Sequence, residues 1–133
     1  MKVFLGGTCS GYRWRDELIP MLKCNYFNPM TKGWNEDKRQ LEVKERENAD
    51  YVLYVITADI KGVYSIAEVV DDSNKRPEKT IFCVLEKNMN YKMMHSLNAV
   101  KNLVAKNGAT VCIDLQSVAN FLNKKAAERN KNE

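Results

Sequence analysis

Glu68 is the first candidate for a reactive side chain in this sequence. Ser65 and Glu68 form an S-x-x-E pattern after the apolar run 51–57, and this pattern predicts a short helix over about 65–72. In one interpretation it is a capping box, in which the glutamate folds back onto the N–H of Ser65. In the other, the helix dipole favours the ionised Glu68 carboxylate in the first turn, and this carboxylate attacks an electrophilic sugar carbon. The spacing leaves both open.

A glycine-rich loop over residues 6–13 is the second candidate. Glycines let main-chain N–H groups approach a ligand, while hydroxyl and guanidinium groups hold sugar hydroxyls or a phosphate. The loop matches neither GxGxxG nor the GxxxxGK pattern of triphosphate-binding loops, so neither a dinucleotide nor a triphosphate is implied. The candidate binding residues in and beside it are Gly6, Gly7, Thr8, Ser10, Arg13 and Arg15.

Short apolar runs alternate with helical patterns along the chain, which is typical of βαβ units around a parallel sheet. Five strands and five helices in alternation predict an α/β fold of the flavodoxin or Rossmann type. We expect a three-layer sandwich whose five-stranded parallel sheet has the order 2-1-3-4-5, with ligands bound at the carboxyl ends of the strands. The expected strands are 2–6, 25–28, 51–57, 80–85 and 109–113, the expected helices are 14–23, 35–48, 65–72, 91–106 and one capped by Asp114, and the loops at the carboxyl edge are 6–13, 28–34 and 57–65.

The 133 residues suit a single domain, which we expect over 1–123. The charged stretch 124–133 has only two alanines as apolar residues, so its composition predicts fraying. No apolar run approaches the roughly 20 residues that span a bilayer. The first residues form too short an apolar stretch for a signal peptide, so we expect a cytoplasmic protein without a membrane partner.

Composition argues against several classes of site. The four cysteines show no CxxC spacing and are accompanied by one histidine, so we expect neither a metal nor another cofactor. The net charge of +4 lies partly in the last ten residues. Basic residues interleaved with aromatic ones do not form a stripe, so we expect no nucleic acid polymer as a partner.

Several stretches carry a resemblance to a known family: KVFLGGT at 2–8, WRDELIP at 14–20, YFNP at 26–29, ADYVLYVIT at 49–57 and YSIAE at 64–68. The sequence resembles the nucleoside 2-deoxyribosyltransferase superfamily, especially its short deoxyribosyltransferase-like group from bacteria and phages. The resemblance implies cleavage or transfer of the N-glycosidic bond of a 2-deoxynucleoside or its 5′-monophosphate. It also implies a homo-oligomer, because family members commonly place site residues from a neighbouring subunit.

The resemblance gives roles to individual residues. Glu68 falls on the family's nucleophile, which attacks C1′ as the base leaves and forms a covalent glutamyl-deoxyribose intermediate. Glu42 falls on a carboxylate that orients the substrate or handles protons. Phe4 falls on an aromatic residue that helps to position the nucleophile and is a tyrosine in the characterised enzymes. Gly62 falls on a second family carboxylate, for which Asp59 could substitute as proton donor.

The remaining candidates have alternatives. Trp14 and Trp34 could stack on a base or pack in the core, and Asn28 lies in the second loop of the carboxyl edge. Glu42 could instead form an i,i+4 ion pair with Arg46 on an exposed helix. A phosphate contact by Arg13 or Arg15 would make the substrate a nucleotide rather than a nucleoside.

Two other functions stay open at this point. One is a glycohydrolase acting on NAD or a related ribonucleotide, which needs only a different sugar and base pocket. The other is a nucleotide-binding or sensing module without turnover, which the glycine at position 62 and the phenylalanine at position 4 favour.

Overall fold

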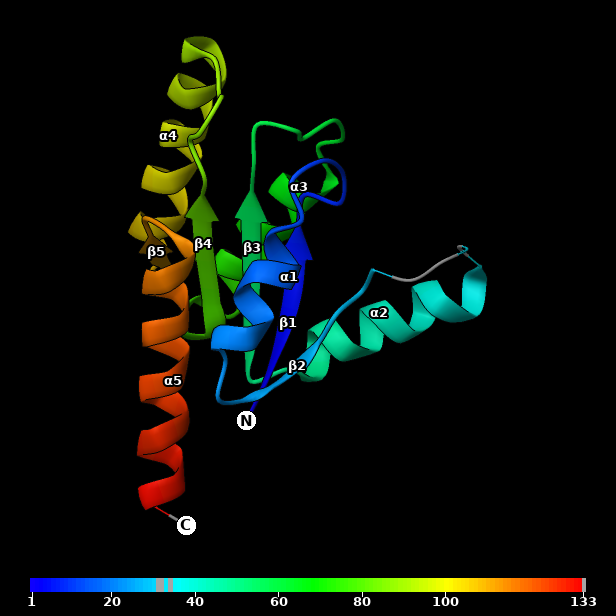
Figure 1. Ribbon diagram of the computed structural model, residues 1–133, viewed down its shortest axis with the longest axis vertical. Coiled ribbons are helices and arrows are strands. Elements are labelled where there is room, and N and C mark those ends of the chain that lie inside the picture. Colours follow the sequence, from blue (N-terminus) through cyan, green and yellow to red (C-terminus); the bar gives the residue numbers. More distant parts are fainter. Residues whose placement is uncertain (31–32, 34, 133) are drawn as a thin grey trace.

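The sheet has the predicted order. The computed structural model describes residues 1–30, 33 and 35–132. Its five strands are all parallel in the order β2-β1-β3-β4-β5, which confirms the α/β fold of the Rossmann type (Figure 1). β3 is the central strand of the sheet. Its β-branched and aromatic side chains are almost fully buried, as expected for a strand that is covered on both faces. The strands are β1 (Lys2–Gly7), β2 (Asn25–Phe27), β3 (Tyr51–Ile56), β4 (Thr80–Val84) and β5 (Thr110–Cys112).

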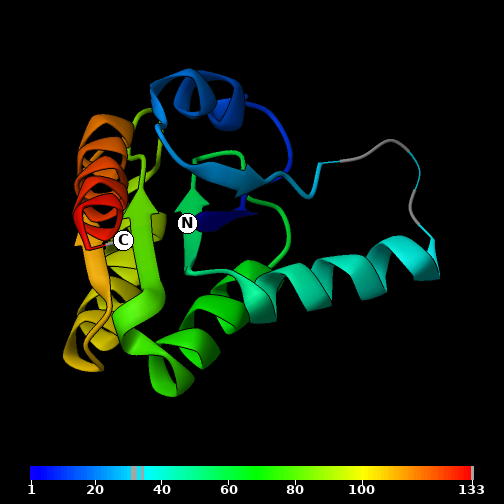
Figure 2. The ribbon, with the colours of Figure 1, turned by 90° about the horizontal axis from the view of Figure 1, so that it is seen from below.

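Helices cover both faces of the sheet and complete the three layers (Figure 2). One apolar cluster joins the sheet to α1 and α5 through Trp14, Leu18 and Leu122. The other joins the opposite face to α3 and α4 through Val69 and Leu97. No helix of the described residues is long and apolar enough to cross a membrane. The helices are α1 (Trp14–Leu18), α2 (Glu36–Asn48), α3 (Tyr64–Lys75), α4 (Tyr91–Lys106) and α5 (Leu115–Lys131), with 3₁₀ turns at Ile19–Met21 and Pro77–Lys79.

Helix α2 projects away from the body of the domain, and only its C-terminal end approaches the sheet (Figures 1 and 2). Asn35 caps it as predicted, since the Asn35 side chain accepts a hydrogen bond from Lys38 N. None of its residues is buried, and its two large apolar side chains, Leu41 and Val43, are 47% and 41% exposed. The last turn of α2 nevertheless brings side chains over the carboxyl half of β1.

Helix α5 continues through residues 124–131, the stretch whose composition predicts fraying. Ala126 in this stretch is 6% exposed, so the helix still has a packed face beyond residue 123. Arg129 NH1 lies 2.9 Å from Asp50 Oδ1, which joins the end of α5 to the start of β3. These contacts are tertiary, and the local composition does not reveal them.

Candidate functional site

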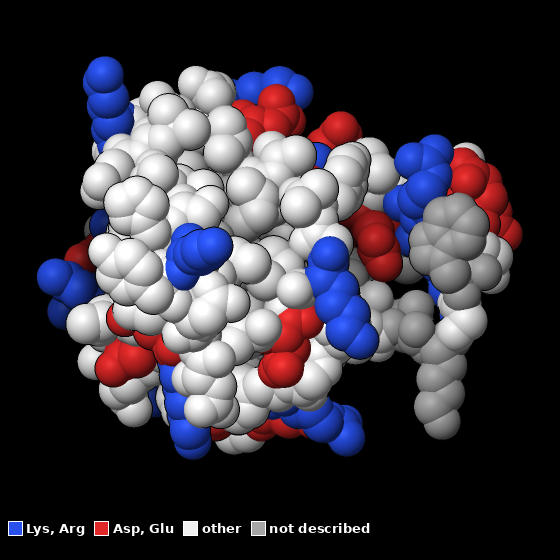
Figure 3. All heavy atoms as spheres, turned by 90° about the horizontal axis from the view of Figure 1, so that it is seen from above, with Lys and Arg blue, Asp and Glu red and all other residues white. Residues whose placement is uncertain are grey.

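A cavity of about 300 Å³ lies where the carboxyl end of β1 meets α2 and α3. Both carboxylates at the centre of the sequence argument, Glu42 and Glu68, line it. Figure 3 looks onto the carboxyl edge of the sheet, where acidic and basic side chains are scattered around a largely uncharged surface. On this face, the described basic residues do not form a continuous patch. The predicted site residues that line the cavity are Phe4, Gly6, Gly7, Arg15, Glu42, Ser65 and Glu68.

Glu68 does not cap its helix, so the capping-box prediction is wrong. α3 begins at Tyr64 with Val63 at the N-cap and no side-chain cap. Ser65 is therefore the second residue of the helix and Glu68 the fifth, beyond the first turn where the helix dipole acts most strongly. Support for the Glu68 carboxylate comes from a side chain on another helix.

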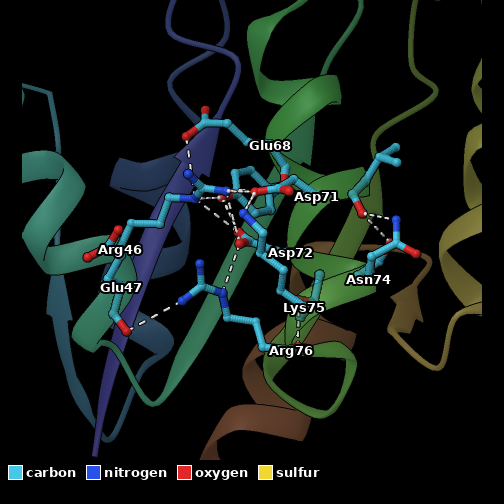
Figure 4. A network of polar contacts seen from close by, with 12 residues as sticks. Arg46, Glu47, Glu68, Asp71, Asp72, Asn74, Lys75 and Arg76 are labelled. Carbon is cyan, nitrogen blue, oxygen red and sulfur yellow. Dashed lines mark hydrogen bonds and ion pairs between the residues drawn. The ribbon is translucent and has the colours of Figure 1, made fainter.

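That side chain is Arg46, at the C-terminal end of α2. Arg46 Nε lies 3.6 Å from Glu68 Oε2, and the two side chains are only 14% and 19% exposed. Figure 4 shows the two side chains pointing toward one another across the gap between α2 and α3. The predicted i,i+4 pair of Arg46 with Glu42 does not form among the described contacts, because the guanidinium points to α3 instead.

Asp72 and Tyr54 hold Arg46 in this position. Arg46 NH2 lies 2.9 Å from Asp72 Oδ1, and Arg46 Nε donates to Tyr54 Oη at 2.9 Å and to Asp72 Oδ2 at 3.1 Å. The Tyr54 hydroxyl donates to Asp72 Oδ2 at 2.6 Å, and Arg76 Nε bonds the same buried carboxylate from its other side (Figure 4). The guanidinium that faces Glu68 is thus fixed by a buried network on the sheet.

The two cavity carboxylates have different electrostatic surroundings. Burial raises the pKa of the Glu68 carboxyl, and the Arg46 guanidinium opposes this rise. Burial also raises the pKa of Glu42, which the charge of Arg15 opposes. Glu42 forms no ion pair with a described residue, whereas Glu68 faces a fixed cation. The pKa of both carboxyls is thus raised by burial, and at Glu68 a fixed cation 3.6 Å away opposes the rise while the charges of Asp72 and Glu42 add to it.

The small size of Gly6 and Gly7 is required by the neighbouring strand. A Cβ at Gly7, whose φ is +116°, would lie 2.1 Å from Val55 O, and one at Gly6 would lie 2.8 Å from the Tyr54 ring. Both glycines line the cavity, but the close approach of β3 already accounts for them. Phe4, also on β1, stacks on Phe27 with ring centroids 5.8 Å apart.

Four other predicted binding residues line a smaller cavity of about 180 Å³ beside the first. Trp14 takes the packing role of its two alternatives, because it is 1% exposed and its indole N–H donates to Thr8 O at 2.9 Å. The Thr8 hydroxyl accepts a hydrogen bond from Thr57 N at 3.0 Å. Cys9 and Arg15 line both cavities and so mark their junction. The four residues are Thr8, Arg13, Trp14 and Asn28.

The remaining predicted residues do not meet Glu68. Asp59 lines a separate cavity of about 540 Å³, and its Oδ2 accepts a hydrogen bond from Tyr12 N at 2.8 Å. Ser10 Oγ donates to Asp59 O, so this pair fastens the first loop to the loop after β3. Gly62 is exposed, with open space around the position of a Cβ. Trp34 lies outside the described residues.

Sequence reasoning missed Arg46 as part of the site. Its partners Asp71 and Asp72 lie 25 and 26 residues later, on α3, so no local spacing connects them. The available signal was Asp72, an acidic residue three positions after Val69 on the apolar face of its helix. A carboxylate in that position needs a buried cation. Among the described residues, no group of three or more His, Cys, Asp or Glu could hold a metal ion.

Comparison with known proteins agrees with this geometry. A search of curated proteins finds no significant match. A family model described as "Nucleoside 2-deoxyribosyltransferase like" matches residues 1–88, which contain β1 to β4 and every residue that lines the Glu68 cavity. Since the match spans 88 of the 133 residues, the chain belongs to the nucleoside 2-deoxyribosyltransferase-like family.

Proposed function

We propose that this protein cleaves or transfers the N-glycosidic bond of a 2-deoxynucleoside or its 5′-monophosphate, with Glu68 as the nucleophile. The observation that carries the proposal is the contact between Glu68 and the fixed Arg46 guanidinium, 3.6 Å apart in a cavity that also holds Glu42. Family membership supports glycosyl transfer in general. The pair of carboxylates supports this particular chemistry, because displacement at a sugar carbon needs one nucleophile and one acid.

The two carboxylates divide these roles through their surroundings. Arg46 favours the charged form of Glu68, which is the form that attacks carbon. We assign the acid role to Glu42, because it lines the same cavity, burial raises its pKa, and it forms no ion pair with a described residue. Asp59 is less suited to that role, because it lines a different cavity and its carboxylate already accepts the Tyr12 N–H.

The reaction runs in two displacements. An oxygen of Glu68 forms a bond to C1′ while the C1′–N bond breaks through an oxocarbenium-like transition state. The electron pair of that bond goes to the base, which takes a proton from Glu42. Water then attacks C1′ of the glutamyl ester and gives a proton to Glu42, while the bond between C1′ and Glu68 breaks and its electron pair returns to the Glu68 carboxylate, which releases the sugar. A second base in place of water gives exchange, and both routes retain the configuration at C1′.

We also propose that a second copy of the chain covers the open side of the cavity. Val43 and Tyr64 line the cavity, and the exposed apolar side chains of the two elements that flank it are Leu41 and Val43 on α2 and Val63 and Tyr64 at the start of α3. The last two are 78% and 74% exposed. A projecting helix with apolar side chains and no buried residue is typical of an element that packs on a partner.

Base release measured by chromatography tests the proposed activity. The substrates are the four deoxynucleosides, their 5′-monophosphates, the matching ribonucleotides and NAD, each with and without an acceptor base. Glu68→Gln should lower release by about a thousandfold or more, since it removes the nucleophile. Glu47→Gln is the matched control, because Glu47 is an exposed glutamate on the same domain whose side chain lies outside the cavity.

Each outcome is informative. Free base in the wild type and in Glu47→Gln, but not in Glu68→Gln, supports the proposal. Release of nicotinamide alone would identify a glycohydrolase of NAD instead. Equal release by Glu68→Gln would contradict the role of Glu68. If no substrate gave base release or exchange, the remaining alternative would be a nucleotide-binding module without turnover.

A further inference from the structure

Arg15, on α1, carries a buried guanidinium that is held rigidly against the carboxyl end of β1. The residue is 5% exposed. Its Nε donates to Leu5 O at 3.0 Å and its NH1 to Thr8 O at 2.9 Å. The guanidinium carbon also lies 4.2 Å from the centre of the Trp14 ring. Two main-chain carbonyls and an aromatic face therefore fix the plane of the guanidinium, so the group cannot rotate toward a different set of protein partners.

The third nitrogen of this guanidinium lacks a partner. Among the described residues, Arg15 NH2 is the buried side-chain polar atom without a hydrogen bond. No described carboxylate forms an ion pair with Arg15, and burial lowers the pKa of the guanidinium. A hydrogen-bond contact with the Cys9 side chain and the charge of Glu42 act in the opposite direction. A buried cation with an unused donor and no ion pair to a described residue is costly, so its presence points to a ligand.

The position of Arg15 relates this ligand to the proposed reaction. Arg15 lines both the cavity that holds Glu68 and the smaller cavity beyond Cys9. In a nucleotide, the sugar ring and one methylene separate the 5′-phosphate from C1′. A phosphate at Arg15 would thus occupy the junction while C1′ remains in the cavity of Glu68.

We propose that Arg15 is the core of an anion subsite that binds the 5′-phosphate, so that the substrate is a nucleoside 5′-monophosphate. This inference rests on the proposed function for the rest of the substrate. A sugar hydroxyl or a base carbonyl could accept the free NH2 donor but would leave the charge uncompensated. A phosphate supplies both an acceptor oxygen and the negative charge. Arg13 is not equivalent, because it is 84% exposed and lies 2.6 Å from Asp16.

Calorimetric binding to the Glu68→Gln protein tests the subsite without turnover. We expect a deoxynucleoside 5′-monophosphate to bind about 10- to 100-fold more tightly than the matching deoxynucleoside, as a charge-assisted hydrogen bond predicts. Adding Arg15→Gln should abolish this preference while the affinity for the nucleoside changes little. Lys44→Gln, which removes an exposed cation on α2 outside the cavity, is the matched control and should keep the preference.

Three results would overturn the subsite. They are equal affinity for nucleoside and monophosphate, a preference that persists in Arg15→Gln, and a preference lost in Arg13→Gln but kept in Arg15→Gln. If Arg15→Gln does not fold, the NMR signal of Arg15 Nε–H in Glu68→Gln decides. It should shift on addition of the monophosphate and not of the nucleoside, and an unchanged signal would overturn the assignment.

The subsite and the proposed function fail in different ways. Base release by the wild type together with equal binding of nucleoside and monophosphate would remove the subsite alone. An Arg15-dependent preference for the monophosphate without release or exchange would remove the activity and leave a nucleotide-binding module.

Discussion

Arg46 Nε lies 3.6 Å from Glu68 Oε2, and Asp72 holds the same guanidinium at 2.9 Å. The first contact joins the projecting helix α2 to the cavity, and the second anchors it on the buried face of α3. Because Asp72 and Tyr54 already bind Arg46, the position of the cation does not depend on Glu68. In the proposed reaction, Arg46 is thus a positioning residue that acts through Glu68.

Arg46→Gln should impair the reaction most at low pH. Arg46 opposes the rise in the pKa of Glu68, so its removal raises that pKa further. The attacking form is ionised, and activity is lost as the pH falls through the pKa. The acidic limb of the pH–kcat profile should therefore move to higher pH. At the optimum, loss of positioning should lower kcat by about a hundredfold.

Arg46→Lys provides the control for Arg46→Gln, since it keeps the cation and should restore much of the acidic limb. A variant with lower kcat and an unmoved pH profile would show that Arg46 serves only the fold.

Asp72→Ala should be strongly destabilising. Asp72 is fully buried and accepts hydrogen bonds from Arg46, Arg76 and Tyr54, all of which the substitution leaves without this partner. Removal of one member of such a network costs about 3–5 kcal/mol in free energy of unfolding. Urea denaturation measures this change.

Asp71→Ala is the matched control for Asp72→Ala, because the neighbouring carboxylate is 43% exposed and contacts Arg46 at 3.3 Å. It should cost about 1 kcal/mol or less. Similar losses for both variants would argue against a network anchored on Asp72.

The fold could be predicted from the sequence because its signals are local. The β-branched run of β3 and the alternation of strands and helices led to the observed sheet order, since connection rules leave few topologies. Asn35 and Asp114 cap their helices as expected, each bonding an N–H three residues on. Such features involve neighbours along the chain.

The site could be predicted only in part, because its contacts join distant segments. Glu42 and Glu68 line one cavity, as the family resemblance implied. The support of Glu68 by Arg46 spans 22 residues, and the expected cap at Ser65 failed because the helix begins one residue earlier at Tyr64. Asp59 lies near Glu68 in sequence, yet the loop after β3 carries it to another cavity.

Glu42→Gln should remove the proton donor. Burial raises the pKa of Glu42, and the protonated form is the active one, so activity falls as the pH rises through that pKa. The variant should lower kcat about 100- to 10,000-fold for ordinary bases and abolish the alkaline limb of the pH profile. A substrate whose base leaves without a proton should react almost normally. Equal loss for both substrates would assign Glu42 to substrate binding instead.

Leu41→Glu should convert the proposed oligomer into monomers. Leu41 is 47% exposed on the projecting helix α2, and a charge there would oppose burial against a second copy. Leu103→Glu is the matched control, because Leu103 is 46% exposed on α4, away from the cavity. Light scattering after size exclusion should give a smaller mass for Leu41→Glu than for Leu103→Glu. A monomeric wild type would contradict the oligomer, and full activity of that monomer would show that the described residues complete the site within one chain.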